Sequence, residues 1–219
     1  MKAYQFSFAE VWKALPYLTE GAGLTVGISL LAMLVGLALG LGLALLSQTP
    51  LRPARWAVVA YVEVFRNTPL LIQIFFIYFG LPGLGLRLPA FGSGLLALSL
   101  YSAAYNAEVF RAGLEAVPLG QREAARSTGL SAWQEARHVI VPQALRIAFP
   151  ALGNNLVSLV KNSSLVSAIG MVELMFVAND ISFNNFRSFE VYGAAVLYYV
   201  VLILALSRGL AWVERRMAA

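Results

Sequence analysis

The sequence predicts an all-α integral membrane protein with about five transmembrane helices. Of its 219 residues, 59% are hydrophobic and 12% are charged, whereas about a quarter of the residues in a soluble domain are charged. The apolar residues are gathered into long segments with few charges. Because about 20 apolar residues in a helix cross the hydrocarbon core of a bilayer, each such segment predicts one span. The whole chain is expected to form a single membrane domain.

The predicted spans differ in how strictly apolar they are. The first, 21–47, has no charged residue, and it is too long and begins too far from the first residue for a signal peptide. The second contains Glu63, Arg66 and Pro69, and the fourth contains Lys161. Ionisable residues at membrane depth usually face a cavity or a partner. The other four spans are 56–81, 88–116, 147–172 and 191–213.

The basic residues predict the orientation. Three segments must share one side if there are five spans: the link after the first span, the link after the third, and the end of the chain. These segments hold Arg52, Arg55, Arg111, Arg122, Arg126, Arg137, Arg146, Arg208, Arg215 and Arg216. Short cytoplasmic loops are rich in Lys and Arg, so the N-terminus is expected outside and the C-terminus in the cytoplasm. The net charge of +5 is thereby explained without nucleic acid.

The link between the third and fourth spans contains signals for two short helices. Residues 121–128 read as one helix that Gly129 stops, because glycine adopts the left-handed conformation at a helix end. Ser131 and Gln134 have the spacing of a capping box that starts another helix. Pro142 is expected to end this second helix near residue 140 or 141. The link is thus predicted to be an ordered helix-turn-helix.

The link, 117–146, has three possible roles. A DNA-binding helix-turn-helix is disfavoured, because the segment lies between two membrane spans. A solvated connector is the simplest alternative. About twenty residues of ordered helix exceed what a hairpin link needs, and long loops are usually functional. The preferred interpretation is a docking element for a cytoplasmic partner.

Several groups of residues resemble motifs of a known family. Glu123-Ala124-Ala125, Gly129 and the terminal Val139-Ile140-Val141-Pro142 resemble the EAA motif of ABC importer permeases, with Val at both aliphatic positions of its Ile-x-Leu-Pro end. Segments 62–73, 105–111 and 161–165 resemble the polar amino-acid uptake branch, which includes histidine, glutamine and arginine permeases. The resemblance covers roughly residues 21–216 and combines several motifs, which makes it specific.

The resemblance implies the ABC importer type I permease fold, in the prokaryotic plasma (inner) membrane. It implies a dimer with a second permease copy or a paralogue, two cytoplasmic ATPase subunits that bind ATP and Mg, and an external solute-binding protein that delivers an amino acid. The chain itself has no Gly-x-x-x-x-Gly-Lys-Ser/Thr loop, so it is expected not to be an enzyme and to hold no cofactor. With no Cys and one His, no metal site is expected. The alternative is a secondary transporter driven by an ion gradient.

The EAA resemblance also assigns residues that couple the permease to the ATPase. Glu123 is expected to pair with a basic group of the ATPase, while Ala124 and Ala125 are small enough for close approach. Gly129 is expected to fix the angle between the two helices of the link, since other residues are strained there by about 1–2 kcal/mol. These four residues are the predicted coupling residues.

Thr68, Leu70 and Gln73 are candidate substrate-binding residues in the second span. The sequence Thr68-Pro69 suits a helix that breaks and restarts with a side-chain cap. The restarted end points free N–H groups and a positive dipole into the protein, which suits a substrate carboxylate. A proline kink with a structural role is the equally weighted alternative.

The fourth span carries a polar stripe. Asn154, Ser158 and Lys161 fall on one helix face, with Asn155 and Asn162 beside it. Asn155 and Ser158 are therefore predicted to line a substrate pocket, and the alternative is hydrogen bonding between helices.

Glu63, Arg66, Glu108 and Lys161 are predicted to form an intramembrane charge network. Glu63 and Arg66 share one helix face and are expected to be able to pair. Lys161 has two interpretations: it answers the substrate carboxylate, or it neutralises Glu108 or Glu173 in a structural role, which is preferred. In the secondary-transporter alternative, Glu63 or Glu108 is the acid coupled to the ion.

Overall fold

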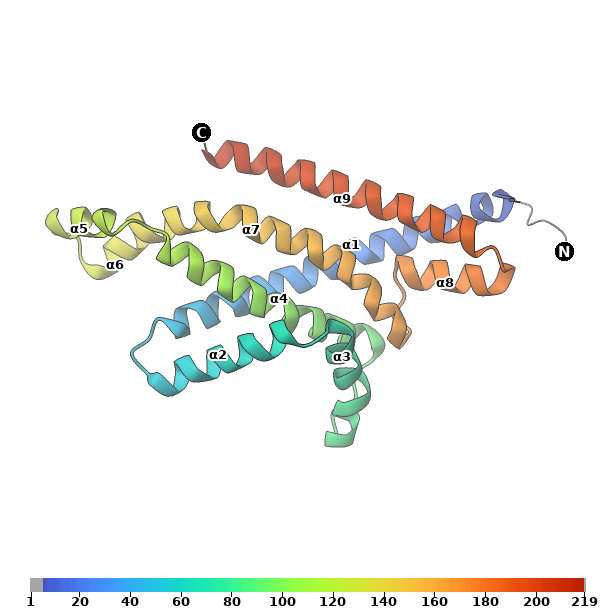
Figure 1. Cartoon of the computed structure of the whole chain (residues 1–219), viewed down its shortest axis with the longest axis horizontal. Helices are drawn as coiled ribbons and strands as arrows, with labels where there is room; N and C mark the ends of the chain where they lie inside the picture. The colour runs from blue at the N-terminus through green and yellow to red at the C-terminus, as the bar shows by residue number, and fades with distance from the viewer. Residues whose placement is uncertain (1–5, 219) are drawn as a thin grey trace.

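The computed structural model describes residues 6–218, and all regular elements in that range are helical. The α-helices are α1 (Ala9–Ser47), α2 (Arg52–Asn67), α3 (Leu70–Phe75), α4 (Ala90–Glu115), α5 (Leu119–Ser127), α6 (Ala132–Glu135), α7 (Val141–Asn162), α8 (Leu174–Asn185) and α9 (Ser188–Ala218). Short π-helical turns η1 (Phe76–Gly80) and η3 (Ala136–Ile140) and 3-10 turns η2 (Leu81–Leu84) and η4 (Ser163–Ile169) join them. The long helices run roughly along one axis, and the segment from α3 to η2 projects to one side (Figure 1). The predicted all-α class is confirmed.

The spans differ in detail from the sequence prediction. Among the described residues, α1 and α9 alone are long and apolar enough to cross a membrane. Two further spans are possible if bent pairs count: α2 with Leu70–Leu84, bent by 108°, and Ala132–Ile169 with α8, bent by 48°. The 26 residues of α4 reach about 39 Å, but this helix is not among the candidates by composition. The predicted count of five therefore depends on α4.

α4 is more polar than a lipid-facing helix because it lies inside the protein. Ser93, Ser99, Ser102 and Asn106 on this helix are all buried. The largest hydrophobic core is built around it from α1, α3, α4, α7 and η4. That core includes Ile28, Ile74, Leu98, Leu159 and Val166. Protein contacts therefore replace lipid around α4.

Glycines allow α1 to approach α4 closely. A Cβ atom added at Gly36 would lie 2.5 Å from Ser102 Oγ, and one added at Gly40 would lie 2.8 Å from Asn106 Cβ. Both distances are too short for non-bonded heavy atoms, so neither position has room for a side chain. Such small-xxx-small spacing is typical of tightly packed membrane helices.

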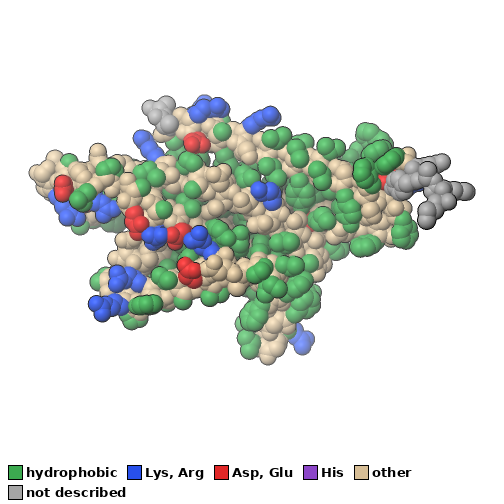
Figure 2. Space-filling model, viewed as in Figure 1, with side chains coloured by type: hydrophobic (Ala, Val, Ile, Leu, Met, Phe, Trp, Pro, Cys, Tyr) green, Lys and Arg blue, Asp and Glu red, His purple; other side chains and the backbone are tan. Residues whose placement is uncertain are grey.

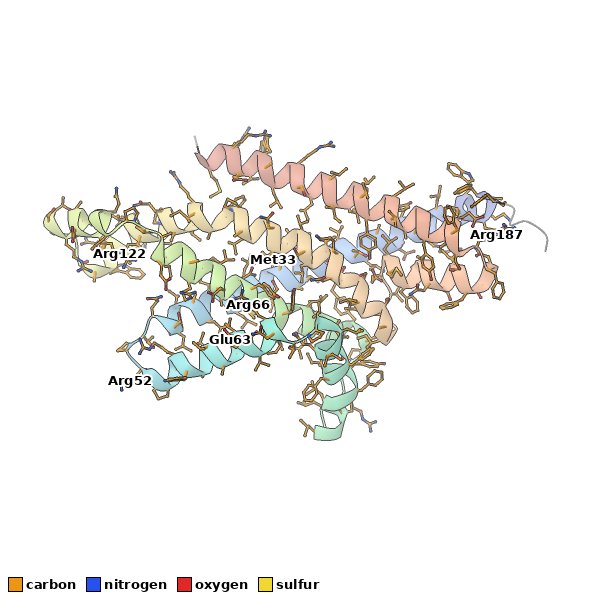
Figure 3. The ribbon with its side chains drawn as sticks, in the orientation of Figure 1. Met33, Arg52, Glu63, Arg66, Arg122 and Arg187 are labelled. Atoms are coloured by element: carbon orange, nitrogen blue, oxygen red, sulfur yellow. The ribbon has the colours of Figure 1, made fainter. Side chains whose placement is uncertain are left out.

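The surface is consistent with a membrane environment. Figure 2 shows hydrophobic side chains over much of the visible face, with most charged side chains toward one end. Arg52 and Arg122 lie at that end, whereas Arg187 lies at the opposite end (Figure 3). α9 ends near the first group, and α1 begins near Arg187 (Figure 1). The basic segments that the orientation prediction requires on one side do share one end of the molecule.

The link between α4 and α7 folds as two short helices. Gly129 has φ +80°, its N–H donates to Arg126 O over 3.0 Å, and the N–H of Leu130 donates to Ala125 O over 3.3 Å. These two bonds form the Schellman arrangement, and the predicted left-handed glycine is confirmed. Ser131 and Gln134 form the predicted capping box at the start of α6.

The prediction that Pro142 ends the second helix was wrong. α6 continues through the π-helical turn η3 into α7, and Pro142 lies in the first turn of α7. Proline lacks an N–H group and its ring clashes with the carbonyl four residues earlier, which the wider π-helical turn relieves. Ala132–Ile169 is thus one continuous helical segment.

Candidate functional site

The second predicted span is broken at the expected position. α2 ends at Asn67 and α3 begins at Leu70, with Pro69 between them. The predicted side-chain cap is absent from α3. Instead, the Thr68 hydroxyl donates back to Val64 O over 2.7 Å, in the preceding turn. The break is confirmed, and its predicted cap was wrong.

Gln73 holds this corner together. Its Nε2 donates to Phe65 O over 2.9 Å, to Thr68 O over 3.1 Å and to Thr68 Oγ1 over 2.9 Å. Gln73 is 8% exposed, and its Oε1 is buried without a hydrogen-bond partner in the described part of the chain. Leu70 is buried in the main hydrophobic core. These side chains shape the corner, as the proline-kink alternative supposes.

Asn155 and Ser158 line a small hollow between α7 and α4. This cavity, of about 80 Å³, is also bounded by Tyr101, Ser102, Tyr105 and Leu159. Asn155 Nδ2 donates to the buried Asn106 Oδ1 over 3.1 Å. The structure therefore places Asn155 both beside a cavity and in a hydrogen bond between helices. The two interpretations of this residue are compatible.

The predicted charge network forms around Glu108 with different partners. Arg66 Nη1 lies 3.9 Å from Glu108 Oε2, while Arg111 makes a closer ion pair with Glu108. Glu63 makes no ion pair with Arg66, and its Oε2 accepts a hydrogen bond from Asn67 Nδ2 over 2.6 Å. A groove of about 720 Å³ between α2, α4 and the end of α1 is lined by Glu63, Arg66, Glu108 and Arg111. Figure 2 shows the mixed charges gathered in this hollow.

Lys161 is separate from this network. It is exposed at the end of α7 and makes no ion pair with any described acidic residue. Glu108 has Arg66 and Arg111 as partners. Lys161 therefore neutralises neither Glu108 nor Glu173, which were its two expected partners.

Glu173 was undervalued by the sequence analysis. It is fully buried at the start of α8, where its carboxylate accepts hydrogen bonds from Thr25 Oγ1 (3.1 Å), Tyr199 OH (3.0 Å) and Phe176 N (2.8 Å). It thereby ties together α1, α8 and α9. Glu173 is also the N-cap of α8, a position at which the shorter Ser, Thr, Asp and Asn are preferred, so its residue type gave only a weak signal.

The predicted coupling residues lie on α5 and, for Gly129, in the turn that follows it. Glu123, Ala124 and Gly129 are exposed, whereas Ala125 is buried. Ala125 is therefore a packing residue between the two short helices. Glu123 and Ala124 lie on the part of α5 that faces away from the protein.

An ion pair missed by the sequence analysis holds α5 against α6. Arg126 Nε lies 2.9 Å from Glu135 Oε2, and the Glu135 side chain is only 4% exposed. Hydrogen bonding to Glu135 raises the pKa of Arg126 above its usual value. Residues nine positions apart across a turn have no helical periodicity, so no sequence pattern indicated this contact.

No group of three or more His, Asp or Glu residues in the described part of the chain is arranged to hold a metal ion. The side chains described above form a neutral polar hollow between α4 and α7 and a charged groove between α2 and α4.

Comparisons with known proteins identify the family. Residues 36–219 match the family model described as "Binding-protein-dependent transport system inner membrane component". The chain is 37% identical over 215 residues to the glutamine transport system permease protein GlnP of Escherichia coli (strain K12), covering 97% of this chain and 98% of that protein. It is 36% identical over 201 residues to the arginine transport system permease protein ArtQ of Bacillus subtilis (strain 168), covering 91% and 92%.

A solved structure is similar over the same length. The crystal structure of an amino acid ABC transporter with histidines contains a chain that is 39% identical, with a TM-score of 0.92, covering 97% of this chain and 100% of that one. ATP-driven transport in this family overturns the alternative of an ion-gradient-driven secondary transporter. ATP is bound and hydrolysed by a partner ATPase, and a binding protein is the other implied partner. The chain belongs to the family of binding-protein-dependent inner membrane transport components, as the integral membrane permease subunit of a bacterial ABC importer for polar amino acids.

Proposed function

We propose that the amino acid passes between α4 and α7, through the small cavity lined by Asn155 and Ser158. This cavity is the observation that carries the proposal, since its polar lining lies between two core helices. Ser102 and Tyr105 add hydroxyl groups from α4. Neutral polar groups at this depth suit transient contacts, because a strongly bound substrate would not be released.

The substrate class is an L-amino acid with a polar side chain. The relatives are named for glutamine and arginine, and the similar crystal structure is described with histidines. These side chains differ in charge, but the amino acids share the α-carboxylate and the α-ammonium group. We propose that this permease recognises mainly the shared groups, while the external binding protein selects the side chain.

The transport cycle is alternating access in a dimer. A second permease copy or a paralogue completes the path, and two ATPase subunits contact the exposed surface of α5 through Glu123 and Ala124. The protein is proposed to lie in the plasma (inner) membrane with its N-terminus outside and α5 in the cytoplasm. The common end for the basic segments supports this orientation.

Uptake by variants of α7 tests the pocket. Asn155→Leu is expected to reduce amino-acid uptake by about tenfold or more in proteoliposomes containing the ATPase and the binding protein, because it removes a polar wall of the path. Asn154→Leu is the matched control: Asn154 is the adjacent residue of the same type, but it is exposed and lines a different hollow, beside α9. Equal loss of uptake in both variants, at equal amounts of assembled complex, would place the path elsewhere.

A further inference from the structure

Three hollows in the protein share walls and form one continuous strip. Tyr105 lines the small cavity of Asn155 and also a second cavity of about 230 Å³. The second cavity is bounded otherwise by Glu63, Arg66 and Asn67. Glu63 and Arg66 in turn line the larger groove between α2 and α4. The second cavity therefore lies between a neutral polar hollow and a charged groove.

Arg66 is only loosely engaged within this cavity. Its nearest acidic atom, Glu108 Oε2, is 3.9 Å away, beyond the usual range for a charge-assisted hydrogen bond. Its guanidinium carbon lies 5.4 Å from the centre of the Tyr105 ring, which allows a cation–π contact. The guanidinium has five N–H donors, and no hydrogen bond from Arg66 is found among the described residues. Donors are available to a ligand.

Glu63 offers the opposite charge on the same helix face. It lies one helical turn before Arg66, and both side chains line the same cavity. Asn67 Nδ2 donates to Glu63 Oε2 over 2.6 Å, which fixes the position of the carboxylate. Figure 3 shows Glu63 and Arg66 close together on α2. The two charges are neighbours that do not neutralise each other.

We propose that this cavity binds the backbone groups of the transported amino acid, with Arg66 taking the α-carboxylate and Glu63 the α-ammonium group. A guanidinium fork matches a carboxylate in two hydrogen bonds, and a carboxylate accepts from an ammonium group. The adjacent hollows leave space on either side for different side chains. This inference rests on the proposed passage of an amino acid between α4 and α7, and it adds the residues that recognise what all substrates share.

The test measures binding to the purified permease–ATPase complex without the binding protein. The twenty standard L-amino acids and L-cystine are screened first, and the best-bound one is compared with its decarboxylated amine and its deaminated acid. Arg66→Gln is expected to weaken binding of the amino acid about tenfold or more and to leave binding of the amine unchanged. Glu63→Gln is expected to weaken binding of the amino acid and to leave binding of the deaminated acid unchanged. Arg55→Gln, which changes a charge of the larger groove only, should alter none of these affinities.

The selectivity of the two variants separates recognition from a structural role: Arg66→Gln should spare the amine, and Glu63→Gln should spare the deaminated acid. If Arg66→Gln weakens binding of the amino acid and of the amine equally, Arg66 only supports the fold and the inference is overturned. Unchanged binding in both variants, or no saturable binding by the unmodified complex, overturns it as well. This outcome is distinct from that of the uptake experiment. If Asn155→Leu loses uptake but Arg66→Gln and Glu63→Gln do not show these selective losses of binding, only the proposed site at Arg66 and Glu63 is contradicted. If the selective losses are found but Asn155→Leu has normal uptake, only the proposed passage beside Asn155 is contradicted.

Discussion

Replacing Gly36 with Ala adds one methyl group where α1 and α4 are closely packed. The new Cβ atom would lie 2.5 Å from Ser102 Oγ and 2.6 Å from Ser102 Cβ. Neither atom is the end of a long flexible side chain, so the helices must move apart. Overpacking of this kind destabilises a protein by about 1–3 kcal/mol.

Gly42→Ala is the matched control, because Gly42 lies in the same helix and an added Cβ there meets no atom within 4 Å. Both substitutions gain the same helix propensity, about 1 kcal/mol, which cancels in the comparison. The difference of about 1–3 kcal/mol corresponds to about 2–12 °C in apparent Tm for a chain of this size. The assay is thermal unfolding of the detergent-purified complex, followed by size-exclusion chromatography of heated samples.

A second substitution tests the contact directly. Ser102→Gly removes the two atoms nearest to the added methyl group. Gly36→Ala combined with Ser102→Gly should therefore unfold about 2–4 °C above Ser102→Gly alone, which is the gain expected from about 1 kcal/mol of helix propensity. Equal apparent Tm values for Gly36→Ala and Gly42→Ala would refute the described packing of α1 on α4.

Three further predictions concern the link between α4 and α7. Gly129→Val places a β-branched residue at φ +80°, which costs about 1–2 kcal/mol of backbone strain. This variant should co-purify with less ATPase while its membrane insertion stays normal. Unchanged co-purification would contradict a coupling role for Gly129. Glu135→Gln removes the charge that pairs with Arg126 and should increase trypsin cleavage after Arg126 several-fold, whereas Glu123→Gln on exposed α5 should not. A thiol introduced by Ser131→Cys, in a chain without other Cys, should react with an impermeant reagent only from the cytoplasmic side, and labelling from outside would invert the orientation.

Features set by neighbouring residues could be predicted from the sequence. The break between Asn67 and Leu70, the capping box of Ser131 and the left-handed Gly129 each depend on a few adjacent positions. Their physical causes are the missing N–H of proline, a short hydroxyl side chain and the absence of a Cβ atom. The residues that resemble the family motifs lie in these same segments, so one set of residues predicted both the local structure and the function.

Features set by distant contacts could not be predicted. The sequence shows that Arg66 and Glu63 share a helix face, but Glu108 comes from another helix and is the residue that Arg66 approaches. Lys161 was expected to pair because charge is unfavourable in lipid, yet its side chain is exposed and makes no ion pair with a described acidic residue. The hydrogen bonds of Glu173 could not be predicted, because its partners Thr25 and Tyr199 lie in the first and the last helix of the chain. Packing between helices decides each case.

The continuous helix Ala132–Ile169 has the shape of a lever, since it joins the cytoplasmic link to the cavity lined by Ser158. It packs closely on α4 at Gly113, where an added Cβ would lie 2.8 Å from Ala144 O, and this contact can serve as the fulcrum. One arm reaches about 18 Å back to Ala132, and the other reaches about 21 Å forward to Ser158. With arms of nearly equal length, a tilt that shifts the loop end in one direction shifts Ser158 by a similar distance in the opposite direction.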